Sequence, residues 1–225
     1  MSKTKNTLYF TSFLVAILVL IAFTPRQPSV LIIGDSISIG YMPFVEKHFS
    51  GRATIVHNPG NAQHTGTGLE KIEEWLGDEQ WDIVQFNWGL WDLCYRHPDA
   101  KVYGNRDKIN GEITHTVEEY ATNLDSIISI LRKKTNAKLI FVTTTYVPEN
   151  EAGRYTTDVK YYNDAAKTVV KKYGIPVNDI YQQSILIHSE FGKGPDDVHY
   201  SSDGYKALGK LITNFLGMEI KQLKN

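Results

Sequence analysis

Two short motifs, one near each end of the chain, hold residue types that can carry out nucleophilic chemistry. The first, Gly34-Asp35-Ser36, follows a short apolar run and precedes an amphipathic stretch. A serine in such a strand-to-helix turn places its hydroxyl at the edge of a parallel sheet and its backbone N–H at a helix start, where the dipole favours a developing oxyanion. The position fits a nucleophile, and a serine that only caps the helix is the alternative.

The second motif, Asp196-Asp197-Val198-His199, lies between a Gly/Pro-rich loop over residues 192–195 and the last helical pattern. A histidine three residues after a carboxylate in a turn, as His199 follows Asp196, can offer one ring nitrogen to a serine while the carboxylate holds the other nitrogen and fixes the tautomer. Either motif alone is a weak signal. Because the two requirements are independent, their conjunction predicts that His199 pairs with Ser36.

Alternating apolar runs and amphipathic stretches predict the elements that position these motifs. Strands are expected over residues 30–33, 54–57, 82–87, 138–144 and 176–178, and helices over residues 37–48, 69–76, 116–134, 161–173, 181–191 and 203–223. Strict alternation indicates an α/β fold, a parallel sheet with helices on both faces. In such a sheet, chemistry gathers at the carboxyl ends of the strands. The irregular stretch over residues 95–113 is expected to be a surface insertion near the mouth of the site.

Composition excludes several classes of protein. The 225 residues include 24 basic and 25 acidic side chains without a long run of one sign, which gives no footprint for a nucleic acid. The single cysteine, Cys94, excludes an internal disulfide and a CxxC metal site. The histidines show no paired metal-ligand spacing, so neither a metal nor another cofactor is expected.

The N-terminus differs from the rest of the chain. Residues 8–23 carry no charge, follow Lys3 and Lys5, and would form a helix of roughly 24 Å. A basic flank before an apolar run is typical of a secretory signal peptide or an uncleaved membrane anchor. We therefore divide the chain into a signal or anchor over residues 1–28 and one catalytic domain over residues 29–225. Lysines before the run predict that this domain lies outside the cytoplasm.

From about Val30 onward the sequence resembles the SGNH/GDSL hydrolase family. The resemblance rests on Gly34-Asp35-Ser36, on Gly89-Leu90-Trp91-Asp92, and on Asp196 and His199. It implies a three-layer α/β/α sandwich, a flavodoxin-like parallel sheet of about five strands. It also implies Ser36 as nucleophile, His199 as general base and then acid, and Asp196 as the orienting carboxylate. Asp197 is the less favoured orienter, because the family spacing selects Asp196.

Two departures from the family pattern concern the groups that hold the oxyanion. The family's asparagine in the third block is replaced by Trp91, within a segment FNWGLWDL that marks a subgroup of SGNH-like proteins. In the second block, Ala62 falls at the position of the family's glycine, with Gly60 as the alternative. The expected oxyanion donors are therefore the N–H groups of Ser36 and Ala62 and the side chain of Asn87 or Asn61. Losing one donor typically costs about 10²- to 10³-fold in turnover, which leaves a slow enzyme rather than an inactive one.

Four further residues are candidates for contact with substrate. Trp88 and Trp91 flank Gly89 at a strand end, where exposed rings could stack on a sugar, or at least one could pack in the core. Arg154, after the fourth strand, is placed to meet an acidic substrate group, with a solvated loop arginine as the alternative. His64 lies in the second-block loop and could line the site or lie on the surface.

The expected activity is that of a serine esterase acting through an acyl-enzyme, with O-acetyl groups on carbohydrate as the favoured substrate. An acyltransferase using the same triad is one alternative. A carbohydrate-binding protein on a degenerate scaffold is the other, because Trp91 replaces the asparagine. The expected partners are a small-molecule or carbohydrate ester and, through residues 8–23, a membrane.

Overall fold

The fold is built on one parallel sheet, as the alternating pattern predicts. The computed structural model describes residues 26–223. Its five-stranded sheet consists of β1 (Ser29–Ile33), β2 (Thr54–His57), β3 (Ile83–Phe86), β6 (Lys138–Val142) and β7 (Val177–Asn178). The strands are parallel and lie in the order β2-β1-β3-β6-β7, which is the flavodoxin-like order. The predicted fold class is confirmed.

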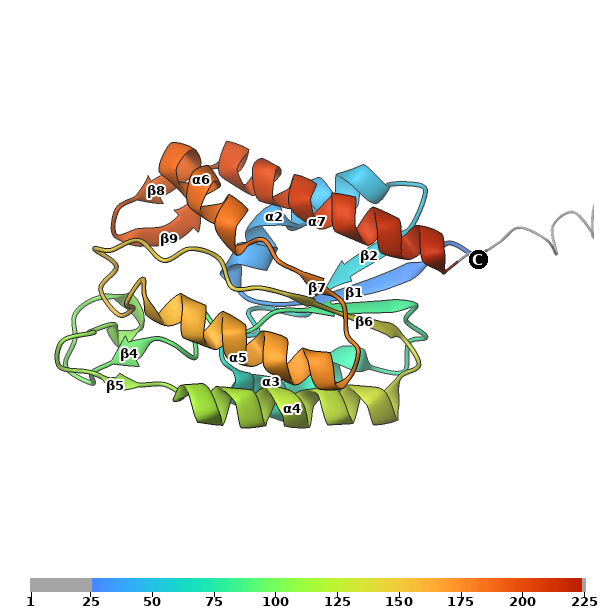
Figure 1. Ribbon diagram of the computed structural model, residues 1–225. Coiled ribbons are helices and arrows are strands. Elements are labelled where there is room, and N and C mark those ends of the chain that lie inside the picture. The colour runs from blue at the N-terminus through green and yellow to red at the C-terminus, as the bar shows by residue number, and fades with distance from the viewer. Residues whose placement is uncertain (1–25, 224–225) are drawn as a thin grey trace, which may run out of the picture.

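Helices cover both faces of the sheet and make three layers (Figure 1). One layer contains α2 (Ser36–Phe49), α6 (Tyr181–Phe191) and α7 (Ser202–Gln222), and the other contains α3 (Thr65–Leu76), α4 (Val117–Lys134) and α5 (Asp158–Lys172). Side-chain caps fix several helix starts: Asp35 caps α2, Thr116 and Glu119 form a capping box on α4, and Ser201 caps α7. The predicted helices differ from the observed ones only by a few residues at their ends.

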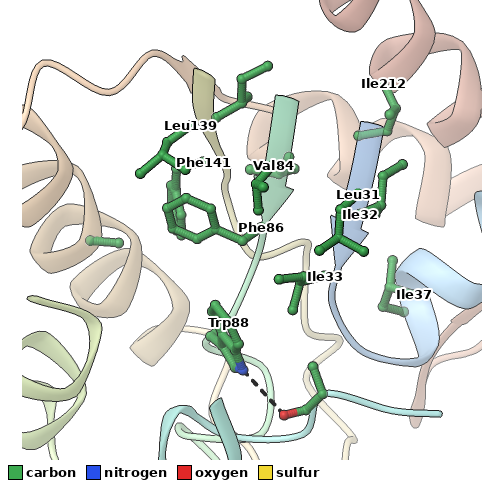
Figure 2. Packing of buried hydrophobic residues seen from close by; sticks show 14 of the residues in the cluster. Leu31, Ile32, Ile33, Ile37, Val84, Phe86, Trp88, Leu139, Phe141 and Ile212 are labelled. Atoms are coloured by element: carbon green, nitrogen blue, oxygen red, sulfur yellow. Dashed lines mark hydrogen bonds between the residues drawn. The ribbon is translucent and has the colours of Figure 1, made fainter. Parts of the chain in front are cut away.

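The central strands are buried on both sides, which explains why their sequences are continuously apolar. Val30 to Ile33 of β1 and all four residues of β3 are buried. Their side chains pack against Phe141 of β6 and against helices of both layers, and Figure 2 shows part of this core. The edge strand β2 has no buried residue. The most buried part of the sheet is therefore its centre, and β1, one of the central strands, leads directly into the loop that carries Ser36.

Two small antiparallel pairs lie together at one end of the sandwich, at the left of Figure 1. The predicted insertion contains β4 (Tyr95–Arg96), a 3₁₀ turn η1 (Tyr103–Asn105) and β5 (Glu112–Ile113). The second pair, β8 (Gly192–Gly194) and β9 (Asp197–Tyr200), is a hairpin that the sequence pattern did not predict. Both pairs stand beside the carboxyl ends of the parallel strands.

The predicted signal or anchor over residues 8–23 lies outside the described residues. Within residues 26–223, no helix combines the length and apolar character needed to cross a membrane.

Gly89, three residues after the end of β3, has no room for a side chain. Its φ is 138°, and a Cβ atom there would lie 2.3 Å from Thr144 Oγ1, in a buried position. We expect Gly89→Ala to lower the free energy of unfolding by about 3 kcal/mol, because backbone strain and overpacking add. Urea unfolding measures this change.

Gly217 provides the matched control, because a Cβ atom there would meet nothing within 4 Å and the residue lies inside α7. Gly217→Ala is expected to stabilise the protein by about 0.5–1 kcal/mol, since alanine loses less backbone entropy in a helix. Equal effects of the two substitutions would contradict this account of Gly89.

Candidate active site

Ser36 is the first residue of α2, in a turn that neighbouring loops hold in place. The Asp35 side chain accepts a hydrogen bond from the first turn of the helix at 2.9 Å. On the other side of the turn, Gly34 N–H donates to Asn58 Oδ1 at 2.9 Å, and Ala62 N–H donates to the Gly34 carbonyl at 3.0 Å. The loop after β2 thus fixes the backbone that presents Ser36.

His199 lies against Ser36 although 163 positions separate them in sequence. The distance from His199 Nε2 to Ser36 Oγ is 2.9 Å, and His199 Nδ1 lies 2.6 Å from Asp197 Oδ1. Because a carboxylate only accepts, Nδ1 carries the proton, and Nε2 is left to accept from the serine hydroxyl. The predicted pairing of Ser36 with His199 is present.

The carboxylate that contacts His199 is that of Asp197, and the expectation that Asp196 holds this ring is corrected. Asp197 Oδ1 also accepts the backbone N–H of His199 at 2.9 Å. Both residues belong to β9, where side chains two positions apart lie on the same face. Asp196 precedes the strand and lines the hollow in front of Ser36. The strand period therefore selects Asp197.

The surroundings keep Asp197 ionised and in position. Burial alone would raise the pKa of Asp197, but hydrogen bonds from the backbone and ring of His199, with the charges of His199 and Lys193, lower it below the usual value. His188 of α6 donates from Nε2 to the Asp197 carbonyl at 2.7 Å. This bond ties the β8–β9 hairpin to a helix of the sandwich.

A hollow of about 560 Å³ opens in front of Ser36. It is lined by residues of the strand-end loops, the insertion and the hairpin: Ser36, Asn61, Leu90, Trp91, Arg96, Tyr103, Gly104, Arg106, Arg154, Lys193, Asp196, Asp197, Val198 and His199. Four cationic side chains and two carboxylates thus surround the serine. Arg96, Tyr103, Arg106 and Lys193 were not predicted from the sequence as site residues. The expected position of the insertion at the mouth of the site was the signal for Arg96, Tyr103 and Arg106, whereas Lys193 lies in the Gly/Pro-rich loop before Asp196.

Two of the four expected oxyanion donors already donate hydrogen bonds to backbone carbonyls. The Ala62 N–H is occupied by the Gly34 carbonyl, so Ala62 does not replace the family's glycine as a free donor. Asn87 Nδ2 donates to the Val142 carbonyl at 2.8 Å, and Asn87 lines a small void behind the serine turn instead of the hollow. These two predictions are corrected.

The residues that carry the other two expected donors, Ser36 and Asn61, line the hollow. Ser36 N–H is one of the donors that a helix start leaves without an intrahelical partner. Asn61 lines the hollow, and its Oδ1 accepts Gln63 N–H at 2.8 Å. This leaves Asn61 Nδ2 without a hydrogen-bond partner among residues 26–223. Gln63 has a φ of 51°, so the left-handed backbone that suits glycine occurs one residue after Ala62.

The two tryptophans beside Gly89 have different surroundings, and the expectation that Trp88 contacts substrate is corrected. Trp88 is 1% exposed, stacks on Trp75 and donates from Nε1 to the Ala62 carbonyl at 3.2 Å (Figure 2). It fits there because α3 carries Gly68, where a Cβ atom would lie 2.8 Å from the Trp88 ring. Trp91 lines the hollow, and the Arg96 guanidinium lies 4.8 Å from its ring centroid.

Arg154 and His64 also lie in environments that the sequence did not specify. Arg154 is buried yet lines the hollow, and it is not a solvated loop arginine. Its Nε donates to the Leu90 carbonyl at 2.6 Å, and its Nη1 lies 2.8 Å from Glu151. His64 caps α3 by accepting Thr67 N–H and does not line the hollow, so its predicted role in substrate contact is corrected.

Within residues 26–223, no group of three or more His, Cys, Asp or Glu side chains is arranged to hold a metal ion. The groups beside Ser36 are those of acyl transfer: a hydroxyl that donates to an imidazole, a carboxylate behind that imidazole, and N–H donors at the hollow.

Comparison with known proteins identifies relatives of this arrangement. A family model for the GDSL-like Lipase/Acylhydrolase family matches residues 32–207. No curated protein sequence matches significantly.

Solved structures share the fold at low sequence identity. A lipase/acylhydrolase from Enterococcus faecalis superposes with a TM-score of 0.64 at 20% identity, covering 84% of this chain and 95% of that one. The acetylxylan esterase Axe2 from Geobacillus stearothermophilus gives 0.65 at 18% identity, with 83% and 93% covered. The acetyl xylan esterase AlAXEase gives 0.64 at 14% identity, with 82% and 97% covered. The chain belongs to the GDSL-like lipase/acylhydrolase family and is an ester-hydrolysing enzyme of the SGNH/GDSL type.

Proposed function

We propose that this enzyme removes O-acetyl groups from carbohydrate through an acyl-enzyme formed on Ser36. The observation that carries the proposal is the continuous chain of hydrogen bonds from Ser36 Oγ through His199 to Asp197, at 2.9 and 2.6 Å, at the base of an open hollow. This geometry meets the requirements for an activated serine nucleophile.

In the first half of the reaction, Ser36 Oγ attacks the acetyl carbonyl carbon while its proton passes to His199 Nε2. The carbonyl π electrons move onto oxygen, and Asp197 stabilises the resulting imidazolium. Collapse of the tetrahedral intermediate breaks the bond to the sugar oxygen, which takes the proton from His199 Nε2. The sugar leaves with a free hydroxyl, and Ser36 carries the acetyl group.

In the second half, a water molecule attacks the acetyl carbon and gives one proton to His199 Nε2. When the second intermediate collapses, the bond to Ser36 Oγ breaks and His199 returns the proton to that oxygen. Acetic acid leaves and ionises to acetate by releasing its proton to solvent, and the starting state of the enzyme is restored. In both intermediates the oxyanion lies within reach of two donors in our proposal, Ser36 N–H and Asn61 Nδ2.

The chemistry of the hollow supports a short acyl group on a polar alcohol. Its lining includes four cationic side chains and two carboxylates, and such groups do not favour a long hydrocarbon chain. Trp91 and Tyr103 give it aromatic walls of the kind that sugars contact. Two of the similar structures, both below 20% identity, are those of acetyl xylan esterases, which agrees with this substrate class.

We further propose that the catalytic domain works outside the cytoplasm, attached through residues 8–23 or released by cleavage. The first described residues lie at the amino ends of the strands, where Arg26 pairs with Asp82 at 2.8 Å and the Pro28 carbonyl accepts Thr54 N–H. The candidate site lies at the opposite edge of the sheet. An attachment before Arg26 therefore leaves the hollow free to meet a polymer.

The full-length protein is expected to release acetate from acetylated oligosaccharides, with kcat/KM at least about 10²-fold above that for a long-chain ester, since the polar lining disfavours such a chain. Ser36→Ala is expected to lower kcat by about 10⁶-fold, as for other serine nucleophiles. Ser38→Ala is the control in the same turn, because Ser38 bonds Asp35 and His57 instead of facing the hollow. It should retain activity to within about tenfold, with about 1 kcal/mol lost in stability.

Three results would contradict the proposal. Efficient cleavage of long-chain esters without acetate release would refute the substrate class. Binding of saccharide without any fluorophosphonate adduct on Ser36 would favour the carbohydrate-binding alternative. Acyl transfer to added saccharide in excess over hydrolysis would identify the enzyme as an acyltransferase on the same site.

The choice between the two aspartates is tested by Asp197→Asn and Asp196→Asn. We expect Asp197→Asn to slow fluorophosphonate labelling of Ser36 by about 10³- to 10⁴-fold, because an amide at this position favours the wrong imidazole tautomer. Asp196→Asn should slow labelling by less than about tenfold. A larger effect of Asp196→Asn would show that the family spacing, and not the β9 face, identifies the orienting carboxylate.

The oxyanion assignment is tested by Asn61→Ala beside Asn87→Ala. Removing the only side-chain amide among the residues that line the hollow should lower kcat by about 10²-fold with little change in KM, as expected for a donor used in the transition state. Asn87→Ala should act mainly on stability, through the lost bond to Val142. If Asn87→Ala has the larger effect on kcat at an unchanged Tm, Asn61 is not the donor.

A further inference from the structure

Three arginines converge on the hollow from two segments that are hydrogen-bonded to each other. Arg96 and Arg106 belong to the insertion, and Arg154 to the loop between β6 and α5. Backbone bonds join the segments: Tyr95 N–H donates to the Gly153 carbonyl at 2.7 Å, and Lys108 N–H donates to the Ala152 carbonyl at 2.8 Å. The arginines are therefore held at fixed positions on one wall of the site.

One buried carboxylate serves two of these arginines. Glu151 is fully buried and accepts from Arg154 Nη1 at 2.8 Å, from Arg106 Nη1, and from Gly153 N–H at 2.8 Å. A single negative charge thus faces two guanidinium groups. The cluster of these three side chains keeps one positive charge uncompensated.

Arg96 adds a cation that no carboxylate balances within residues 26–223. Its guanidinium lies over the Trp91 ring and donates to the Gly104 carbonyl and to Thr114 Oγ1. Burial lowers the pKa of Arg96, and the positive charges of Arg154 and Arg106 lower it further. Three positive charges thus lie where water is partly excluded, and their mutual repulsion is unfavourable. A bound anion lowers this repulsive energy.

The remaining charges of the hollow do not cancel this excess. Asp197 is hydrogen-bonded to His199, so its negative charge acts on the imidazole and not on the arginines. Asp196 is the second carboxylate among the lining residues, which also include the cations Lys193, Arg96, Arg106 and Arg154. The Arg154 guanidinium uses Nε for the Leu90 carbonyl and Nη1 for Glu151. Its Nη2 has no hydrogen-bond partner among the described residues.

We propose that Arg96, Arg106 and Arg154 form a subsite for a carboxylate on the carbohydrate whose ester Ser36 cleaves. The substrate class is an O-acetylated glycan that contains hexuronic acid. A planar carboxylate matches the paired N–H groups of a guanidinium, and the charge-assisted bonds gain strength in a partly desolvated wall. The subsite selects acidic sugars at the same site that removes the acetyl group, so this inference rests on the proposed function.

The direct test compares two substrates that differ only in charge: a mono-O-acetylated methyl hexuronoside and its primary amide. The full-length enzyme is expected to show a kcat/KM about tenfold or more higher for the acid, since one charge-assisted bond is gained. Raising the ionic strength should reduce this ratio, because the attraction is screened.

The two proposals fail in different ways in this experiment. If neither sugar is deacetylated and 4-nitrophenyl acetate is not cleaved, the proposed esterase function is wrong. If both sugars are deacetylated with equal kcat/KM, the esterase function stands and the carboxylate subsite is refuted.

Arg96→Gln locates the subsite, because Arg96 has no carboxylate partner to leave unpaired. The ratio of kcat/KM between acid and amide should fall about tenfold. Arg52→Gln is the matched control: Arg52 is exposed and lies just before β2, at the amino edge of the sheet, so the ratio should not change. An equal loss for both substrates with Arg96→Gln would show that the cation acts on the oxyanion, and would overturn the proposal.

Binding measured without turnover gives a second readout. The Ser36→Ala enzyme should bind the acetylated acid more tightly than the amide by calorimetry, and adding Arg96→Gln should abolish the difference. Arg154→Lys, which keeps a cation beside Glu151, should reduce the preference for the acid because the forked donor is lost. Equal affinities of the Ser36→Ala enzyme for acid and amide would refute the subsite.

Discussion

The hydrogen bond between Ser36 and His199 is the interaction on which the candidate active site depends, and the surrounding structure holds both residues in place for it. It joins two residues 163 positions apart and forms only because the loop after β1 and the hairpin before α7 reach the same edge of the sheet. The buried β1 and β3 fix the base of the serine turn, and bonds from Asn58 and Ala62 hold its backbone. On the other side, His188 pins the strand that carries His199. Ser36 is therefore positioned by the buried strands together with the loop after β2, and His199 is positioned by the bond between its strand and α6.

The cationic wall of the hollow, formed by Arg96, Arg106 and Arg154, is held together by contacts of these charged side chains. Glu151 holds Arg106 and Arg154 together, and the aromatic face of Trp91 supports Arg96. Replacing the family's asparagine by Trp91 removes a neutral donor from the site, yet it supplies the ring on which Arg96 rests. The same substitution thus connects the change in oxyanion donors to the cationic wall.

Periodicity along the chain predicted a parallel α/β sheet with helices on both faces, the two motifs together predicted the pairing of Ser36 with His199, and the resemblance to the SGNH/GDSL family implied the flavodoxin-like three-layer arrangement. Strand and helix patterns are local properties, and parallel strands bring their carboxyl ends to one edge whatever the details of the loops. The orienting aspartate was wrongly predicted because the family spacing was given more weight than the short polar/apolar alternation of Asp197-Val198-His199-Tyr200, which places Asp197 and His199 on one face of β9. Trp88 was misjudged since the space that buries it depends on Gly68 of a separate helix. The burial of Arg154 depends on Glu151 three residues earlier, a pairing that the sequence contains but that only the fold of the loop creates.

The central claim, that Ser36 carries the acyl group during turnover, is tested most directly by trapping the intermediate. The full-length enzyme is mixed with 4-nitrophenyl acetate, quenched in acid within the first turnovers, digested and examined by mass spectrometry. Our account predicts one acetyl group, located on the peptide that contains Ser36 and absent when the ester is omitted. Acetyl found on another residue, or undiminished hydrolysis by Ser36→Ala, would contradict it.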